Sequence, residues 1–224
     1  MMFNFNEKMD LQHKSNDILT IGELLIDMIS EEYDDTFECQ TYNKFFGGSP
    51  SNIAINTKRL GINSLVASAV GHDGLGNFLI KQLEKVQIDT RCIQKVDYST
   101  SLVVVTKSKL TPIPIFYRGA DYHLEYTSQL EEAIRNSKII HFSCWPISMP
   151  QARRTIEKCI EEARVNNGLV CFDPNYHPML WEKGEDGLEY VKSFIGKVDI
   201  VKLLKLMQNA FLVRIVMKII LRSF

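Results

Sequence analysis

"FFGGSPSNIAINTKRLG", residues 45–61, decides the fold class of this chain. Two glycines and a proline stand directly before a run with helical spacing, and the run ends at Gly61, a residue type that often follows the last turn of a helix. Ser49 can cap such a helix, and Pro50 can occupy its first position. Glycine lets a ligand approach the main chain, and a first helical turn has free N–H donors. The stretch therefore fits a ligand site, and equally a plain strand–turn–helix connection.

Working outward, apolar β-branched runs alternate with helical patterns. The runs cover 18–26, 64–71, 101–107, 138–144, 168–173 and 198–202, and the helical patterns cover 50–60, 75–86, 128–136 and 150–167. This alternation predicts an α/β fold with a mainly parallel sheet covered on both faces, which binds ligands at the carboxyl ends of its strands. Two stretches, 35–46 and 112–118, alternate apolar with polar residues without a crossover helix. They predict antiparallel strands of a small lid sheet over the strand ends, and the lid strands are expected within about 35–46 and 101–118.

Composition excludes several classes of protein. A chain of 224 residues and 25.7 kDa can bury one large domain with a small appendage, and its net charge of -1 gives no electrostatic reason to bind nucleic acid or an anionic membrane. Five scattered cysteines indicate reduced thiols and a cytoplasmic location. Residues 1–17 are polar and predict a loose leader, not a secretory signal. No metal site is expected, because the histidines at 72, 123 and 141 lack ligand spacing.

Four motifs in order carry a resemblance to a known family. "GGSPSNIAINTKRLGINSLVASAVGHDGLG" (47–76) resembles the first signature of the ribokinase-like, or PfkB-type, carbohydrate kinases. The matching positions are Gly47, Gly48, Asn52, Gly61, Gly71, Asp73 and Gly76. "IGELLIDMI" (21–29) looks like the family's first strand, with Asp27 at its end. "FYRGADYHL" (116–124) resembles a segment of the fructokinase and 2-keto-3-deoxygluconate kinase branch, one or two residues shorter, and "FDPNYHPMLW" (172–181) matches D-x-N-x-R-x-x-L-W with His177 replacing the arginine.

The resemblance covers about residues 18–202 and implies a ribokinase-like three-layer sandwich with a small antiparallel lid, incomplete at its C-terminus. It also implies which residues contact a sugar. Asp27, Gly47, Gly48 and Asn52 would hold the sugar, and Tyr117 and Arg118 would reach it from the lid. Carboxylates and amides suit a dense array of hydroxyls, and a guanidinium suits a ketose or an acid sugar.

Some of these residues have simpler interpretations. Asp27 can be a loop carboxylate at a strand end, and Arg118 a solvated charge of the lid. Asp121 is predicted to orient the lid turn, and Trp181 to pack in the core.

The resemblance places Asp173 and Asn175 on the phosphate side of the site, at the end of an apolar strand. His177 is shorter than arginine and only partly charged near neutral pH, which weakens phosphate binding at that position. The prolines in this segment can also simply shape a turn.

By resemblance, the activity is transfer of the terminal phosphate of ATP to a sugar hydroxyl, with ATP and Mg²⁺ as cofactors. The family's catalytic aspartate lies in a later G-A-G-D motif, and the 224 residues contain no such string, so no catalytic residue is assigned. An impaired sugar kinase is expected; the alternative is a non-catalytic remnant with weak sugar binding. A nucleoside kinase of the same superfamily is disfavoured by "FYRGAD" and "DPNYHPMLW". The expected partner is a sugar or sugar acid, with a homodimer possible through the lid.

The tail, residues 203–224, has no Asp or Glu and is apolar on every face. Arg214, Lys218 and Arg222 are four positions apart, which fits a membrane-surface helix and argues against a spanning one. A frameshift is the favoured hypothesis. One added base after the codon for Leu203 permits a reading with a capped, amphipathic helix.

Overall fold

The computed structural model describes residues 11–110 and 112–202, so the predictions for the first ten residues and for the tail lie outside the described residues. Six parallel strands form a large sheet in the order β10-β9-β8-β1-β4-β5. The strands are β1 (Asn16–Ile21), β4 (Ser64–Gly71), β5 (Ile93–Val96), β8 (Ser137–Ser143), β9 (Leu169–Asp173) and β10 (Ile200–Val201). The predicted parallel sheet is confirmed. Its first strand begins at Asn16, inside the predicted leader.

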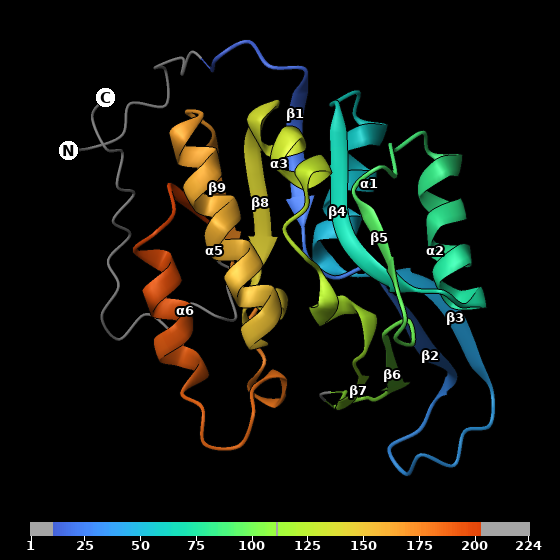
Figure 1. Ribbon diagram of the computed structural model, residues 1–224. Coiled ribbons are helices and arrows are strands. Elements are labelled where there is room, and N and C mark those ends of the chain that lie inside the picture. The colour runs from blue at the N-terminus through green and yellow to red at the C-terminus, as the bar shows by residue number, and fades with distance from the viewer. Residues whose placement is uncertain (1–10, 111, 203–224) are drawn as a thin grey trace.

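Helices cover both faces of the large sheet. The longer ones are α1 (Ser49–Arg59), α2 (Gly74–Lys85), α3 (Ser128–Arg135), α5 (Pro150–Val165) and α6 (Gly187–Ile195); α4 (Cys144–Ile147), η1 (Ala120–His123) and η2 (Pro178–Leu180) are short. Figure 1 shows α3, α5 and α6 in front of the sheet and α1 behind it. The predicted helices are confirmed to within two residues at each end. Within the described ranges, every helix is too short or too polar to cross a bilayer.

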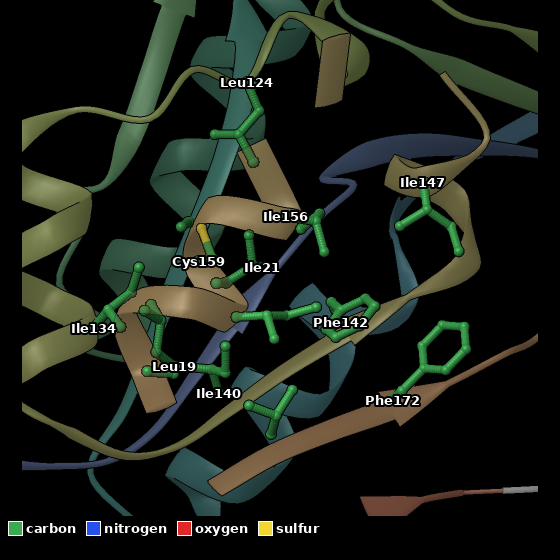
Figure 2. Close-up of a cluster of buried hydrophobic side chains, with 14 of the residues drawn as sticks. Leu19, Ile21, Leu124, Ile134, Ile140, Phe142, Ile147, Ile156, Cys159 and Phe172 are labelled. Carbon is green, nitrogen blue, oxygen red and sulfur yellow. The ribbon is translucent and has the colours of Figure 1, made fainter. Parts of the chain in front are cut away.

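The core follows from the alternation of side chains along the strands. Phe142 of β8 stacks on Phe172 of β9 with ring centroids 4.8 Å apart, and Phe194 of α6 lies against both. Figure 2 shows Phe142 and Phe172 beside the aliphatic side chains of β1, β8 and α5. The opposite face of the sheet packs against a second cluster, in which Val66 contacts α1 residues such as Ala54.

Four strands form the smaller sheet, here called the lid, in the order β3-β2-β6-β7. They are β2 (Leu25–Tyr33), β3 (Tyr42–Gly47), β6 (Leu102–Lys107) and β7 (Pro114–Tyr117). The outer pairs are antiparallel, as predicted, but β2 and β6 are parallel, so the sheet is mixed. The apolar run at 101–107 lies in this sheet, within the range 101–118 that was expected to contain lid strands.

Two predicted boundaries were wrong, one of a strand in the large sheet and one of a strand in the lid. The run 18–26 is not one strand, because Gly22 adopts φ +148° and the chain leaves β1 there to start β2 in the lid. Within 35–46 only the part from Tyr42 is a strand. Before it, Asp34 accepts hydrogen bonds from the N–H groups of Thr36 (2.8 Å) and Cys39 (2.6 Å), and these bonds hold a turn.

The chain passes between the large sheet and the lid four times, at the connections β1–β2, β3–α1, β5–β6 and β7–η1. Figure 1 shows the lid beyond the carboxyl ends of β1 and β8. Parallel sheets bind ligands at this edge, so the four crossings bring the lid to the part of the fold where a site is expected.

Candidate functional site

The glycine turn lies where β3 leaves the lid and α1 begins. Gly48 has φ +105°, and a β-carbon there would overlap with the carbonyl oxygen of Glu23, so both the backbone conformation and the close approach require glycine. Gly48, not Ser49, is the N-cap of α1, and no side chain caps the helix. The predicted serine cap was wrong because the backbone N–H of Ser49 donates to the Glu23 carboxylate (2.9 Å) instead.

Asp27 is the third residue of β2 and not the end of the first strand. It pairs with Phe45 of β3, and Gly47, two residues further, lies on the same face of the lid. A β-carbon on Gly47 would overlap with the Asp27 carboxylate, so the missing side chain makes room for it. Partial burial raises the pKa of Asp27 above its ordinary value. The structure therefore brings Asp27 and the glycine turn together, as predicted.

Asn52 and Asn56 lie on the first two turns of α1, and both side chains are exposed. The backbone N–H of Asn52 donates to the carbonyl of Gly48 (2.9 Å), which fixes this residue one turn beyond the glycine turn. Asn52 thus shares an end of α1 with Gly48, and Asn56 lies one turn further away.

The structure does not bring Tyr117 close to Asp27, because the two residues lie on opposite faces of the lid. The lid register aligns Asp27 with Val103 and Val103 with Phe116, whereas Tyr117 pairs with Leu102 in the next row. Because neighbouring residues of a strand point to opposite faces, Tyr117 lies on the opposite face of the lid, where it is exposed. Phe116 lies on the Asp27 face and contacts Trp145 edge-on, with ring centroids 5.2 Å apart.

Arg118 is held by the protein itself. Its guanidinium donates to the Asp121 carboxylate (Nη2 at 2.5 Å, Nε at 3.0 Å) and to the hydroxyl of Ser148 (2.6 Å), and it lies over the Trp145 ring at 4.8 Å. The simpler interpretation as a solvated lid charge does not fit, because the side chain is only 12% exposed. Nη2 also donates to the carbonyl of Trp145 (3.3 Å), so most of the guanidinium N–H groups of Arg118 already have partners in the protein.

Asp121 is fully buried in this cluster. It accepts hydrogen bonds from the hydroxyl of Ser101 (2.5 Å), the indole Nε1–H of Trp145 (2.6 Å) and the N–H of Gly119 (3.2 Å). These bonds tie β6 and the turn after β7 to α4, so Asp121 orients the lid turn, as predicted.

Glu23 is the residue that the sequence reasoning missed. It lies in the crossing from β1 to β2, it is 3% exposed, and its second carboxylate oxygen accepts from the hydroxyl of Ser143 (2.9 Å). Burial raises its pKa to about 7. The available signal was a glutamate inside an apolar run, since a carboxylate buried there must find polar partners.

The strand ends of β8 and β9 carry the residues predicted for the phosphate side. Asp173 pairs with Ser143 in the register, and its Oδ2 accepts from the ammonium of Lys202 (2.9 Å). Its Oδ1 is buried and has no hydrogen-bond partner among the described residues. Asn175 is exposed, has φ +32°, and its carbonyl accepts from the thiol of Cys144 (3.3 Å).

His177 lies beside the lid. Its Nδ1 accepts from the N–H of Met179 (3.3 Å), its ring meets Phe116 edge-on at 5.2 Å, and burial lowers its pKa. Trp181 stacks on Tyr190 at 5.6 Å and lies over Gly187, so it packs, as predicted. Across residues 11–110 and 112–202, no group of three or more His, Cys, Asp or Glu side chains is placed to hold a metal ion.

One series of neighbours connects the two sides of the candidate site. Asp27 lies against Gly47, the next residue, Gly48, lies against Glu23, and Glu23 binds Ser143, which pairs with Asp173. The acidic and glycine residues therefore line one continuous edge, from the lid to the carboxyl ends of β8 and β9. A carboxylate such as that of Asp27, at the lid end of this edge, suits a polyhydroxylated ligand.

Comparisons with known proteins point to one family. The sequence profile described as pfkB family carbohydrate kinase matches residues 15–203. An ATP-dependent 6-phosphofructokinase of Thermoanaerobacterium thermosaccharolyticum is 59% identical over 201 residues, which are 90% of this chain and 62% of that protein. The chain spans about three fifths of the length of the curated relatives that it matches.

Two solved structures extend the likeness to the fold. Halothermothrix orenii fructokinase has a TM-score of 0.78 and 38% identity, over 83% of this chain and 66% of that one. A sugar kinase of Pyrococcus horikoshii, solved in complex with ATP, has a TM-score of 0.75 and 32% identity, over 82% of this chain and 62% of that one.

Proposed function

The chain belongs to the pfkB family of carbohydrate kinases, and we propose that it forms the sugar-binding part of a kinase that transfers a phosphate from ATP to a hydroxyl of a ketose or keto-sugar acid. The observation that carries the proposal is the half-buried Asp27 carboxylate, which lies against Gly47 beside the glycine turn at the start of α1. Two similar proteins, a fructokinase and a 6-phosphofructokinase, favour a fructose-type substrate.

The proposed sugar contacts are Asp27, Gly47, Gly48 and Asn52. A carboxylate accepts hydrogen bonds from two neighbouring hydroxyls, and partial burial strengthens those bonds because less water competes for them. Phe116 takes the place that the sequence suggested for Tyr117, since it lies on the Asp27 face of the lid. Arg118 contributes its positive charge from the base of the lid.

Asp173 and Asn175 are proposed to face the phosphates of ATP. The buried Asp173 Oδ1 without a partner, next to the Lys202 ammonium, combines an oxygen donor that Mg²⁺ prefers with a cation that binds phosphate. When bound, ATP supplies the phosphoryl group and Mg²⁺ balances its charge. In this chain, Asp173 and Lys202 would hold and orient that end of the site.

We expect the 224-residue chain on its own to bind a ketose without phosphorylating it, because the G-A-G-D string that would carry the catalytic aspartate is not among its residues. Calorimetry with fructose and fructose 6-phosphate measures binding, and ADP release in the presence of ATP and Mg²⁺ measures turnover. Fast turnover by this chain would contradict the expectation. Ketose binding without turnover would favour a non-catalytic binder.

Asp27→Asn is expected to weaken ketose binding roughly ten- to a hundredfold, the usual effect of losing a hydrogen bond to a charged group. The amide keeps the shape of the side chain but replaces one acceptor with a donor. Asp97→Asn is the matched control, because the Asp97 side chain is 99% exposed in the connection from β5 to β6. Equal affinity in Asp27→Asn and the unchanged protein would refute the assignment of Asp27.

We also propose that two copies associate through the outer face of the lid, opposite Asp27. Leu102, Val104, Ile115 and Tyr117 share that face. Ile115 and Tyr117 are exposed, and a shallow groove runs along Leu102, Val104 and Tyr117. Tyr117→Lys is expected to shift a dimer to monomer in sedimentation velocity, whereas Tyr98→Lys, at another exposed tyrosine, leaves the dimer intact. If the unchanged protein is monomeric, this proposal is wrong.

The cytoplasmic location stays a prediction.

A further inference from the structure

Glu23 contacts three segments that meet at the sugar-binding edge. Its Oε1 accepts from the backbone N–H of Ser49 (2.9 Å), the first residue of α1, and its Oε2 accepts from the hydroxyl of Ser143 (2.9 Å) at the end of β8. The backbone carbonyl oxygen of Glu23 accepts from the hydroxyl of Ser51 (2.8 Å) and lies against Gly48. One buried residue therefore fixes the glycine turn from two sides.

The contacts reach beyond the turn. Ser143 is the N-cap of α4, where its hydroxyl accepts from the N–H of Trp145 (3.3 Å). Trp145 in turn donates to Asp121, which holds the base of the lid. Glu23 is thus the link between the glycine turn and the cluster that anchors the lid.

We propose that Glu23 is a positioning residue for the sugar site: its carboxylate holds the first N–H of α1 and the hydroxyl of Ser143 in place, and so sets the shape of the sugar-binding turn. It acts through the turn and does not touch the sugar. The inference rests on the proposed function only in using a ketose as the probe, and a second measurement below needs no sugar.

The surroundings of Glu23 make its charge sensitive to pH. Burial is the main cause that raises its pKa to about 7, and the negative charge of Asp121 on η1 raises it further. Cys144 of α4 also faces it, and burial raises the pKa of that thiol so that it stays uncharged. The first turn of α1, residues 49–52, contains no titratable side chain. The other titratable group at the turn is Asp27, which lies on Gly47.

The ionised form matches the observed arrangement, because a carboxylate accepts from both Ser49 and Ser143. Protonation turns one carboxylate oxygen of Glu23 into a donor, which weakens its hydrogen bonds to Ser49 and Ser143. The dissociation constant for fructose, which is uncharged, is therefore expected to fall roughly three- to tenfold as pH rises from 6 to 8. Glu23→Gln, an isostere of the protonated form, is expected to bind weakly and equally at both pH values.

Asp199→Asn is the matched control. Asp199 also accepts a hydrogen bond from a backbone N–H, that of Val170 (2.8 Å), but near the start of β9, away from the site. This variant is expected to keep the pH dependence of the unchanged protein. A pH profile that survives in Glu23→Gln would belong to another group, such as Asp27, and would overturn the inference. If Glu23 had only a structural role, Glu23→Gln would change thermal stability but keep the pH dependence of fructose binding.

The second measurement follows the backbone amide of Ser49 by ¹⁵N NMR without any ligand. Its resonance is expected to titrate with a midpoint near pH 7 in the unchanged protein, and to stay constant in Glu23→Gln. A Ser49 amide that does not respond to pH between 6 and 8 would refute the role of Glu23. If fructose fails to bind at any pH while this amide titrates, the proposed function fails and the positioning role stands.

Discussion

Replacing Asp121 with alanine is expected to lower the free energy of unfolding by about 3–5 kcal/mol, the usual effect of removing one partner from a buried ion pair. The guanidinium of Arg118 would stay largely buried without its counter-charge, and the donors of Ser101 and Trp145 would lose their acceptor. Such a loss is a large part of the stability of an ordinary domain. Urea unfolding followed by tryptophan fluorescence and by far-ultraviolet circular dichroism measures it.

The control for Asp121 is Glu189→Ala, which removes the carboxylate of an exposed pair with Lys192 (2.5 Å) on α6. We expect a much smaller change there than for Asp121→Ala, because water already solvates both charges. Asp121→Asn keeps the shape and one acceptor, so its effect should lie between the two. A loss below about 1 kcal/mol for Asp121→Ala would mean that Arg118 finds other partners, and that the cluster does not anchor the lid.

Gly48→Ala is expected to abolish measurable ketose binding and to destabilise the fold. Its φ of +105° costs a side chain about 1–3 kcal/mol in backbone strain. The added β-carbon also overlaps with the carbonyl oxygen of Glu23, and a backbone atom cannot rotate aside. Relief therefore requires the turn to move away from Glu23, which disrupts the site. Calorimetry with fructose and thermal unfolding report the two effects separately.

Gly61→Ala separates strain from overlap. Gly61 also has a positive φ, +85°, but no atom lies within 4 Å of a β-carbon added there. We expect a loss of about 1–2 kcal/mol in stability and unchanged ketose affinity. If both variants lose the same stability and both still bind fructose, the close approach of Gly48 to Glu23 is not what shapes the site.

Much of the fold could be predicted because local patterns determine it. The apolar runs of β4, β8 and β9 are buried on both faces, and the spacing of α1, α2, α3 and α5 marks an apolar stripe for each helix. The family resemblance rests on residues that need a particular backbone, such as Gly48. These features are readable because each depends on a few neighbours along the chain.

Other features depend on contacts between distant segments. The run 18–26 reads as one strand, since only the torsion at Gly22 shows where the chain leaves the large sheet. The sequence alone does not show whether Tyr117 or Phe116 shares a face with Asp27, because a shift of one residue in the register of β7 exchanges the two. Glu23 looked like part of a strand; its importance comes from Ser49 and Ser143, which only the tertiary structure brings to it.

The four crossings between the sheets have a consequence for how the polypeptide reaches its native state. In the lid, Ile26 of β2 pairs with Leu102 of β6, and β3, α1, β4, α2 and β5 lie between them in the chain. The large sheet closes an even longer loop, because Ile18 of β1 pairs with Ile139 of β8, so neither sheet is complete until distant segments of the chain have met. For the same reason the lid is not a module: transplanting it into another protein would require four junctions, not one insertion.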